Sequence, residues 1–370
     1  MIAWVTIVFL IFYVLLILVY FWGWTRIQYF KQTGTNTKQI FTIVIPARNE
    51  EKNIIQCLTS IVNQTYSATL FEIIVVNDHS TDSTKNLVEG FISQNNSHKI
   101  TLINLDNLTE KITLKKAAIT YAIKQANANY IALTDADCVR GENWLQIIAD
   151  FISTKGSKFI YAPVEFTAKT FFEKIQSLEF AGLVGIGASA IQLKNPNMCS
   201  AANLIFSKQA FFEVDGYKGN DGIPSGDDEF LLHKFFKKFP NQIHFLKHKD
   251  AIVYTSPSAS LAQLTEQRKR WVSKSTKYEN RYITAILIAA YLFNFSILWH
   301  LLFEPIFGLK LLIIKSAVEG VFLYTVLAFF NKKSYLLLLP IAEIFHILYV
   351  VIIGIWGNIG TYNWKDRKLK

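Results

Sequence analysis

The stretch Tyr130-Ile131-Ala132-Leu133-Thr134-Asp135-Ala136-Asp137-Cys138 decides the fold, because a short apolar run ends there in two carboxylates one residue apart. The run predicts a buried strand, and aspartates are poor strand formers that are costly to bury unpaired. Ligands of an open α/β sheet bind at the carboxyl ends of its strands. Asp135 and Asp137 therefore predict a site for a divalent cation held between carboxylates and a diphosphate. A local alternative is that Asp-Ala-Asp caps the next helix.

Similar runs on either side of this stretch predict a mainly parallel sheet flanked by helices. The expected strands are 41–45, 72–76, 100–105 and 130–134, and they end near Pro46, Asp78, Leu105 and Asp135. Helical periodicity follows each of the first three, with Asn49 expected to cap the first helix. Alternation of strands and helices is typical of a parallel sheet covered on both faces, so polar groups should converge at one sheet edge.

Two common nucleotide-binding motifs are absent from the sequence. The turn after the first strand has no glycine, whereas a dinucleotide-binding fold needs Gly-x-Gly-x-x-Gly there. Gly-x-x-x-x-Gly-Lys-Ser/Thr is also missing, which excludes a P-loop. Metal and carboxylates are the remaining means of holding phosphates.

Long apolar segments at both ends predict membrane helices. Residues 1–25 are expected to form a transmembrane anchor, 40–278 a cytoplasmic catalytic domain, 282–357 C-terminal transmembrane helices and 358–370 a basic tail. A signal peptide is the alternative for the first segment, but it has no basic region at its start and no small-residue cleavage site. Basic residues directly after the anchor place the catalytic domain in the cytoplasm, and we expect an integral protein of a bacterial inner membrane.

The formal net charge of +10 suits an anionic nucleotide and an anionic membrane surface. Nucleic acid is not expected as a partner, because no motif for it is present. Three scattered cysteines, Cys57, Cys138 and Cys199, indicate neither a disulfide framework nor a zinc site.

Four further motifs join Asp135-Ala136-Asp137 in an ordered set. These are Pro46-Ala47-Arg48-Asn49-Glu50-Glu51, Val76-Asn77-Asp78-His79-Ser80-Thr81-Asp82, Gly226-Asp227-Asp228 and Gln267-Arg268-Lys269-Arg270-Trp271. In order and spacing the chain resembles the membrane-bound family-2 inverting glycosyltransferases of GT-A fold. His79 stands where that family usually has glycine, and we expect an unusual backbone angle there. Lys115-Lys116 stands in place of the family's Gly-Lys.

The resemblance implies a donor site for a nucleotide-diphosphate sugar, with a UDP-sugar as the expected donor. The nucleotide-sugar-binding residues that it implies are Pro46, Ala47, Arg48, Asn49, Glu50, Asp78, Lys116 and Asp135. Lys115 could substitute for Lys116 at the diphosphate, and Asp78 could instead belong to an Asx turn. Asp137, with Asp135, is expected to bind Mg²⁺ or Mn²⁺, which would neutralise the leaving diphosphate.

The same resemblance assigns the catalytic base to Asp228. Inversion needs a carboxylate that deprotonates the acceptor hydroxyl, and repulsion from Asp227 would increase the proton affinity of Asp228. The alternative is an acidic first helical turn favoured by the helix dipole. Asp227, Gln267, Arg270 and Trp271 are expected to serve the acceptor and the diphosphate. The last three lie on one helix face, and a basic helix lying on lipid is the other interpretation.

Three functions follow from these features. The first is an inverting hexosyl- or N-acetylhexosaminyl-transferase that acts on a lipid or lipid-linked glycan acceptor. The second is a processive synthase of a β-linked polymer of N-acetylglucosamine or glucose, which would need partner subunits or a dimer to complete a channel. The third, a non-catalytic sugar-binding membrane protein, is disfavoured because every expected acid is present.

The C-terminal topology stays open at this stage. Three crossings, over 282–303, 306–330 and 334–357, would put the tail outside, although its basic residues favour the cytoplasm. Lys310 and Lys315 make the middle segment the weakest span.

Overall fold

The computed structural model describes residues 2–32, 38–107, 114–220, 222–274, 277, 280–357, 361–365 and 367–369. They form two compact units: residues 1–26, 166–190 and 257–370 make up the first, and residues 27–165 and 191–256 the second. The tail positions 358–360, 366 and 370 lie outside the described residues.

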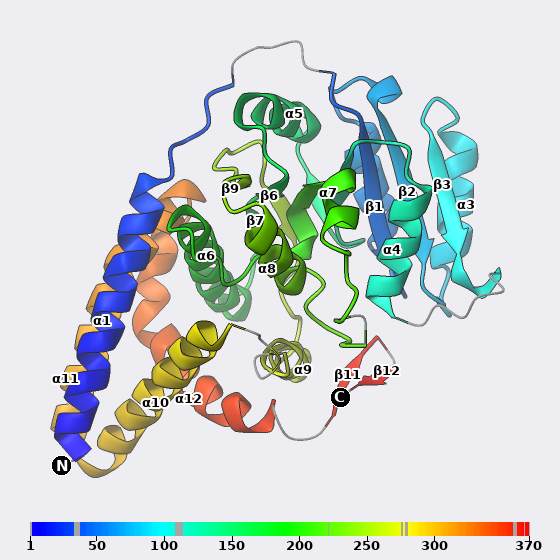
Figure 1. The fold of residues 1–370 in the computed structure, drawn as a ribbon. Coiled ribbons are helices and arrows are strands. Elements are labelled where there is room, and N and C mark those ends of the chain that lie inside the picture. Colours follow the sequence, from blue (N-terminus) through cyan, green and yellow to red (C-terminus); the bar gives the residue numbers. More distant parts are fainter. Residues whose placement is uncertain are drawn as a thin grey trace. The chain divides into compact units, whose positions relative to one another are not determined.

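The second unit is built on a seven-stranded mixed sheet, which confirms the predicted α/β class (Figure 1). Its strand order is β3-β2-β1-β4-β8-β6-β9, and β1 to β4 are mutually parallel, whereas β8 runs antiparallel to both its neighbours. The strands are β1 (Phe41–Ala47), β2 (Phe71–Asn77), β3 (Ile100–Asn104), β4 (Tyr130–Leu133), β6 (Phe159–Tyr161), β8 (Leu204–Ser207) and β9 (Ile243–Phe245). A smaller sheet contains β5 (Val139–Arg140), β10 (Val253–Thr255) and β7 (Val164–Phe166).

Helices connect these strands. They are α2 (Ile54–Val62), α3 (Thr84–Gln94), α4 (Lys115–Gln125), α5 (Trp144–Lys155), α7 (Lys208–Glu213) and α8 (Glu229–Lys238), with short 3₁₀ turns η1 (Ala68–Leu70), η2 (Leu105–Asn107) and η3 (Ala201–Asn203). Helices α2, α3 and α4 follow the first three strands as the periodicity predicts. The central strands are apolar and fully buried on both faces, as in Ile43, Ile73 and Ile131, which is typical of a parallel sheet under two helical layers.

The expected role of Asn49 as a helix cap is wrong. Helix α2 begins at Ile54, and Asn49 adopts a left-handed conformation with φ 51°. Its side chain accepts a hydrogen bond from the Thr81 amide at 2.9 Å, thirty-two residues away. A tertiary contact therefore takes the amide side chain that local capping would have used.

The first unit is helical and apolar. It contains α1 (Ile2–Arg26), α6 (Phe171–Gln192), α9 (Leu261–Val272), α10 (Arg281–Phe303), α11 (Pro305–Phe329), η5 (Lys333–Leu338) and α12 (Leu339–Trp356), followed by the hairpin β11 (Tyr362–Trp364) and β12 (Arg367–Leu369). The part of α6 up to Ala190 belongs to this unit. Four segments are long and apolar enough to cross a membrane: Ile2–Arg26, Arg281–Phe303, Pro305–Phe329 and Lys333–Trp356. Helix α1 packs against α10 and α11 (Figure 1).

Candidate functional site

Two loops at the carboxyl ends of β1 and β2 interlock. Arg48 Nη1 donates to the backbone oxygens of Asp78 at 2.8 Å and His79 at 2.7 Å. The Asn49 amide donates to Ser80 Oγ at 3.1 Å, and the Asp78 amide donates to the Ala47 carbonyl at 2.8 Å. The Pro46–Glu50 segment thus holds the Asp78 loop in place; its direct contact with a nucleotide sugar stays a prediction.

Asp78 is buried at this edge, with 3 % of its surface exposed. Its carboxylate lies 2.9 Å from His79 Nδ1, and the other ring nitrogen of His79 lies 3.5 Å from Asp106. The residue that makes the Asx-type contact is Asn77, whose side chain accepts from the Ser80 amide at 3.2 Å. His79 has φ 56°, so the predicted unusual backbone angle is present.

Carboxylates from two distant segments meet at Lys115, the first residue of α4. Its ammonium lies 2.9 Å from Asp135 Oδ1 and 3.0 Å from Asp227 Oδ2. Asp135 follows β4 and Asp227 precedes α8, so this one side chain joins two of the predicted motifs. Burial alone would lower the pKa of Lys115, but the two carboxylates raise it above its usual value, and the ammonium stays charged.

The pKa of Asp227 shifts in the opposite direction. Burial by itself would raise its pKa, but Lys115 and, more weakly, Lys116 lower the pKa below the ordinary aspartate value. Asp227 is therefore a carboxylate neutralised by an ion pair. The repulsion on Asp228 that the sequence suggested is correspondingly reduced.

Asp228 occupies the N-cap of α8, and its Oδ1 atom accepts from the Glu229 amide at 2.8 Å. Gly226, two residues earlier, has φ 78°, which a side chain at that position would disfavour. The turn thus presents Asp227 and Asp228 in succession at the start of a helix. The role of Asp228 as the catalytic base stays a prediction.

The two lysines of α4 have different surroundings. Lys115 contacts the acidic groups, whereas Lys116 is buried, donates to the Asn220 carbonyl at 2.8 Å and lies over the Phe230 ring at 4.9 Å. Lys115 is accordingly the better placed of the two for a diphosphate beside Asp135. The resemblance favoured Lys116 by position, with Lys115 as the alternative.

The donor set fits a magnesium or manganese ion that shares its shell with phosphate. Asp135 and Asp137 are both partly exposed, and Asp137 Oδ1 has the weak donor Cys138 Sγ at 3.5 Å. No group of three or more His, Cys, Asp or Glu side chains is arranged for a metal among the described residues. Mg²⁺ is usually held by one or two carboxylates plus phosphates and water, so a two-carboxylate site is compatible with it.

The predicted acceptor residues Gln267, Arg270 and Trp271 lie on α9, in the helical unit. Arg268, beside these residues on α9, does not fit the alternative of a basic helix that lies on lipid. It is buried and forms an ion pair with Glu179 at 2.7 Å. Its guanidinium lies 4.3 Å from the Trp271 ring centroid. These contacts fix the orientation of the tryptophan.

The segment Asn197–Asn203, which is rich in small residues, ends in a side chain with a structural role. Asn203 is fully buried, donates to the carbonyls of Pro163 and Ala251 at 2.8 Å each, and accepts from Trp144 Nε1 at 3.1 Å. Asn203 thus links three separate segments of the chain.

Asp106 is an acid beside His79 that the sequence did not lead us to expect at this edge. It follows the end of β3, and the same signal that identified Asp78 and Asp135, an acid after a parallel strand, would have found it.

Comparisons with known proteins identify the family of the chain. A family model described as Glycosyl transferase family 2 matches residues 42–214, and one described as Glycosyl transferase family group 2 matches residues 130–351, more than half of the chain. Glycosyltransferase AglE of Haloferax volcanii is 31% identical over 134 residues, which cover 36% of this chain and 42% of AglE. Poly-beta-1,6-N-acetyl-D-glucosamine synthase of Staphylococcus epidermidis is 24% identical over 233 residues, or 62% of this chain and 53% of the synthase. The chain thus spans about half the length of these curated relatives.

A solved structure resembles the whole chain. It is the mannosyltransferase PcManGT from Pyrobaculum calidifontis in complex with GDP-Man and Mn²⁺, with a TM-score of 0.59 at 16% identity, covering 94% of this chain and 99% of the other. At this identity the likeness concerns the fold alone. With the family models and the observed sheet, it shows that the chain belongs to glycosyl transferase family 2 and has the GT-A fold.

Proposed function

We propose that the protein is an inverting glycosyltransferase that moves a hexosyl or N-acetylhexosaminyl group from a nucleotide-diphosphate sugar to a lipid or lipid-linked acceptor at a membrane. The observation that carries this proposal is the meeting of Asp135, Asp227 and Lys115 at one sheet edge, with Asp228 next in the chain. A cation among carboxylates there suits a substrate whose leaving group is a diphosphate.

In the proposed reaction each residue has a separate role. Asp78, at the end of β2, would bind the nucleoside, and Lys115 would donate to the diphosphate oxygens as the glycosidic bond breaks. Asp228 would accept the proton of the acceptor hydroxyl as its oxygen attacks the anomeric carbon from the face opposite the leaving group. A divalent ion held by Asp137 and Asp135, when bound, would neutralise charge on the departing diphosphate.

The membrane location rests on the four apolar helices and on the basic residues that follow α1. A helix of 23 to 25 residues is long enough for a hydrocarbon core of about 30 Å. Basic residues after α1 favour a cytoplasmic catalytic unit. This arrangement would bring a cytoplasmic nucleotide sugar and a membrane lipid to the same enzyme.

A second candidate is a processive polysaccharide synthase. It is favoured by the similarity to the poly-N-acetylglucosamine synthase over 62% of this chain. The four candidate spans are few for a polymer channel, so we rank this function second.

Product analysis tests both candidates. The purified protein, reconstituted with membrane lipid, is incubated with UDP-glucose, UDP-N-acetylglucosamine or GDP-mannose, and products are sized by mass spectrometry. We expect one donor, a UDP-sugar, to give a lipid that carries a single added sugar. Trp271→Ala should reduce this transfer far more than it reduces nucleotide binding. A ladder of long chains free of lipid would replace this proposal with the synthase, and no turnover of any donor would count against both.

A further inference from the structure

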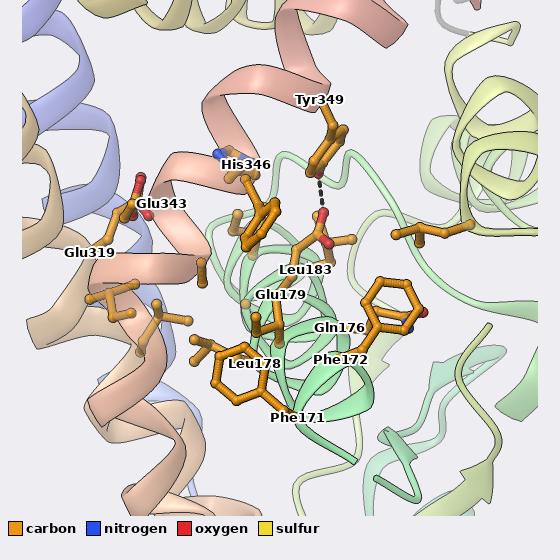
Figure 2. Close-up of a pocket in the computed structure, with 18 of the residues that line it drawn as sticks. Phe171, Phe172, Gln176, Leu178, Glu179, Leu183, Glu319, Glu343, His346 and Tyr349 are labelled. Atoms are coloured by element: carbon orange, nitrogen blue, oxygen red, sulfur yellow. Dashed lines mark hydrogen bonds between the residues drawn. The ribbon is translucent and has the colours of Figure 1, made fainter. Parts of the chain in front are cut away.

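A cavity of about 580 Å³ lies inside the helical unit, where no function has been assigned (Figure 2). Helices α1, α6, α11 and α12 supply most of its wall, with α9 at one end. Most of the lining is aliphatic or aromatic, as in Ile17, Phe172, Leu183, Phe322 and Leu339. Its volume is in the range of about 300–1,000 Å³ that is typical of ligand pockets.

The acidic groups in the wall are paired with neighbouring side chains. Glu319 accepts from Tyr13 and forms an ion pair with Lys315 at 2.7 Å, and Lys315 also pairs with Glu343. Lys315 itself is fully buried behind the wall. Figure 2 shows Glu319 and Glu343 side by side at one end of the cavity.

A further paired acid lies on α6. Glu179 accepts from the Tyr349 hydroxyl, as the dashed line in Figure 2 shows, and pairs with Arg268 at 2.7 Å. The three glutamates of the wall are therefore all paired, and most of the remaining surface is apolar. Such a cavity favours an apolar occupant.

The cavity opens on a side where apolar groups are exposed. Phe171, Leu261 and Phe345 line it, and 52%, 69% and 56% of their respective surfaces are accessible. Exposed apolar groups of this size are unfavourable in water but suit contact with lipid. The helices that bear the cavity include three of the four candidate membrane spans.

The charge of the wall restricts the chemistry of the ligand. Three glutamates line the cavity, whereas neither lysine nor arginine does so among the described residues. An anionic phosphate would therefore find no lysine or arginine of the wall to pair with, whereas a hydrocarbon chain needs none. The Nδ1 atom of His346 is buried in the described structure without a hydrogen-bond partner, and it would accept a hydrogen bond from a hydroxyl group or, when protonated, donate one to an ester oxygen.

Helix α9 connects the cavity to the predicted acceptor residues. Leu261 and Leu264 are in the wall, and Trp271 is seven residues after Leu264 on the same helix. Seven residues correspond to about 10 Å of helix. A lipid chain in the cavity would thus have its polar end within reach of Trp271.

We propose that this cavity binds the hydrocarbon chain of the lipid acceptor, by apolar contact and without recognising a charged head group. That the bound lipid is the sugar acceptor rests on the proposed function. The binding of a lipid chain in the cavity does not depend on it.

The test uses the full-length protein in phosphatidylcholine vesicles that contain a trace of phosphatidylcholine with a diazirine midway along one acyl chain. After irradiation, crosslinked peptides are mapped by mass spectrometry. Crosslinks should concentrate on 171–186 and 339–349. Leu183→Trp, which fills the cavity, should reduce them about tenfold, because the bulk excludes several methylene groups. Leu302→Trp, a control on an exposed face of α10, should leave them unchanged.

Ala342→Phe fills the cavity from α12 and serves if Leu183→Trp does not fold, as judged by gel filtration and circular dichroism. Crosslinks spread evenly over α1, α10 and α11, and insensitive to both filling variants, would overturn the proposal. A preference of more than about tenfold for phosphatidic acid with the same chain would also contradict it, because no lysine or arginine among the described residues lines the wall.

Nucleotide-sugar hydrolysis, measured in parallel, separates the two proposals. Retained hydrolysis with loss of transfer to lipid in the filling variants supports the cavity as the acceptor-chain site. If the wild type turns over no donor but the cavity-specific crosslinks persist, the glycosyltransferase proposal fails and the lipid site stands.

Discussion

Asp228 is the residue on which the proposed chemistry depends most. Asp228→Asn keeps a side chain that can cap α8 but removes the proton acceptor. We expect nucleotide-sugar binding to persist while transfer falls by about 10²–10⁴, the usual contribution of a general base. Steady-state rates and calorimetric binding measure the two effects separately.

Asp250→Asn, at an exposed turn, is the control and should be fully active. An inactive Asp227→Asn beside an active Asp228→Asn would shift the base by one residue.

Lys115 and Lys116 offer a matched pair of substitutions. Lys115→Met removes the cation beside Asp135 and Asp227, so nucleotide-sugar affinity should fall about 10-fold to 100-fold, the value of one charged hydrogen bond. Lys116→Met removes a contact to the Asn220 carbonyl and should mainly lower stability, by about 1–3 kcal/mol. Calorimetric titration with the nucleotide and thermal unfolding distinguish these effects.

Since Lys115→Met leaves Asp227 buried and unpaired, the double variant with Asp227→Asn controls for instability. Donor binding that is lost in Lys116→Met and retained in Lys115→Met would reverse the assignment.

Side-chain direction explains what the sequence could and could not predict at this scale. Acids that follow apolar strands had to lie at one edge, so Asp78, Asp135 and their neighbourhood were predictable. The resemblance favoured Lys116 by position, but adjacent residues of a helix point about 100° apart, so only the packing of α4 shows which lysine faces the acids. The pairing of Asn49 with Thr81 needed the tertiary structure for the same reason.

At the scale of elements, Glu72 joins β2 to its neighbours. It accepts from Thr42 on β1 at 2.7 Å and from the Asn127 amide before β4 at 2.7 Å, and it pairs with Lys99. Burial alone would raise its pKa, but these contacts, led by the Asn127 amide, lower the pKa to about 2 from the ordinary 4.5. The ionised form is therefore favoured in the folded state.

This shift predicts a pH-dependent loss of stability. Because the pKa of Glu72 is lower in the folded protein than in the unfolded chain, its ionised carboxylate stabilises the fold fully at any pH above the unfolded-state pKa. This stabilisation is lost as the pH falls from 4.5 towards about 2. Glu72→Gln should lower the free energy of unfolding by about 2 kcal/mol at pH 7. The difference from the wild type should shrink towards pH 2 in urea titrations. A difference that is constant with pH would show that the carboxylate charge contributes nothing.

The apolar helices show a different limit of sequence reading. Hydropathy gave the bounds of α1, α10 and α11 within a few residues, because length and composition determine them. It could not give the partner of Lys315. Glu319 is one turn away and visible in the sequence, but Glu343 is twenty-eight residues away on α12.

At the scale of the whole chain, contacts within the helical unit bear on the path of the C-terminus. Gly320, nine residues or about 14 Å of helix before the end of α11, lies against Leu339 at the start of α12. Gly357, after α12, lies against Val272 of α9, and β11 also packs against α9. Helix α12 thus begins beside the middle of α11 and returns to the helix that precedes α10.

We therefore predict that α12 enters the membrane without completing a crossing, which puts the basic tail in the cytoplasm. The three native cysteines are buried, so an introduced cysteine reports topology. In intact cells a membrane-impermeant maleimide should label Glu304→Cys, between α10 and α11, but should label Lys365→Cys only after permeabilisation. Labelling of Lys365→Cys in intact cells would show a complete third C-terminal crossing.

The central claim is a metal-dependent transfer from a nucleotide-diphosphate sugar at the Asp135–Asp137 edge, and one measurement tests it most directly. Nucleoside diphosphate released by the reconstituted wild type and Asp137→Ala is measured across a Mn²⁺ titration, with and without excess chelator. We predict release by the wild type that rises with Mn²⁺ and disappears in chelator, and none by a folded Asp137→Ala at any concentration. Full release in chelator, or by Asp137→Ala, would contradict the account.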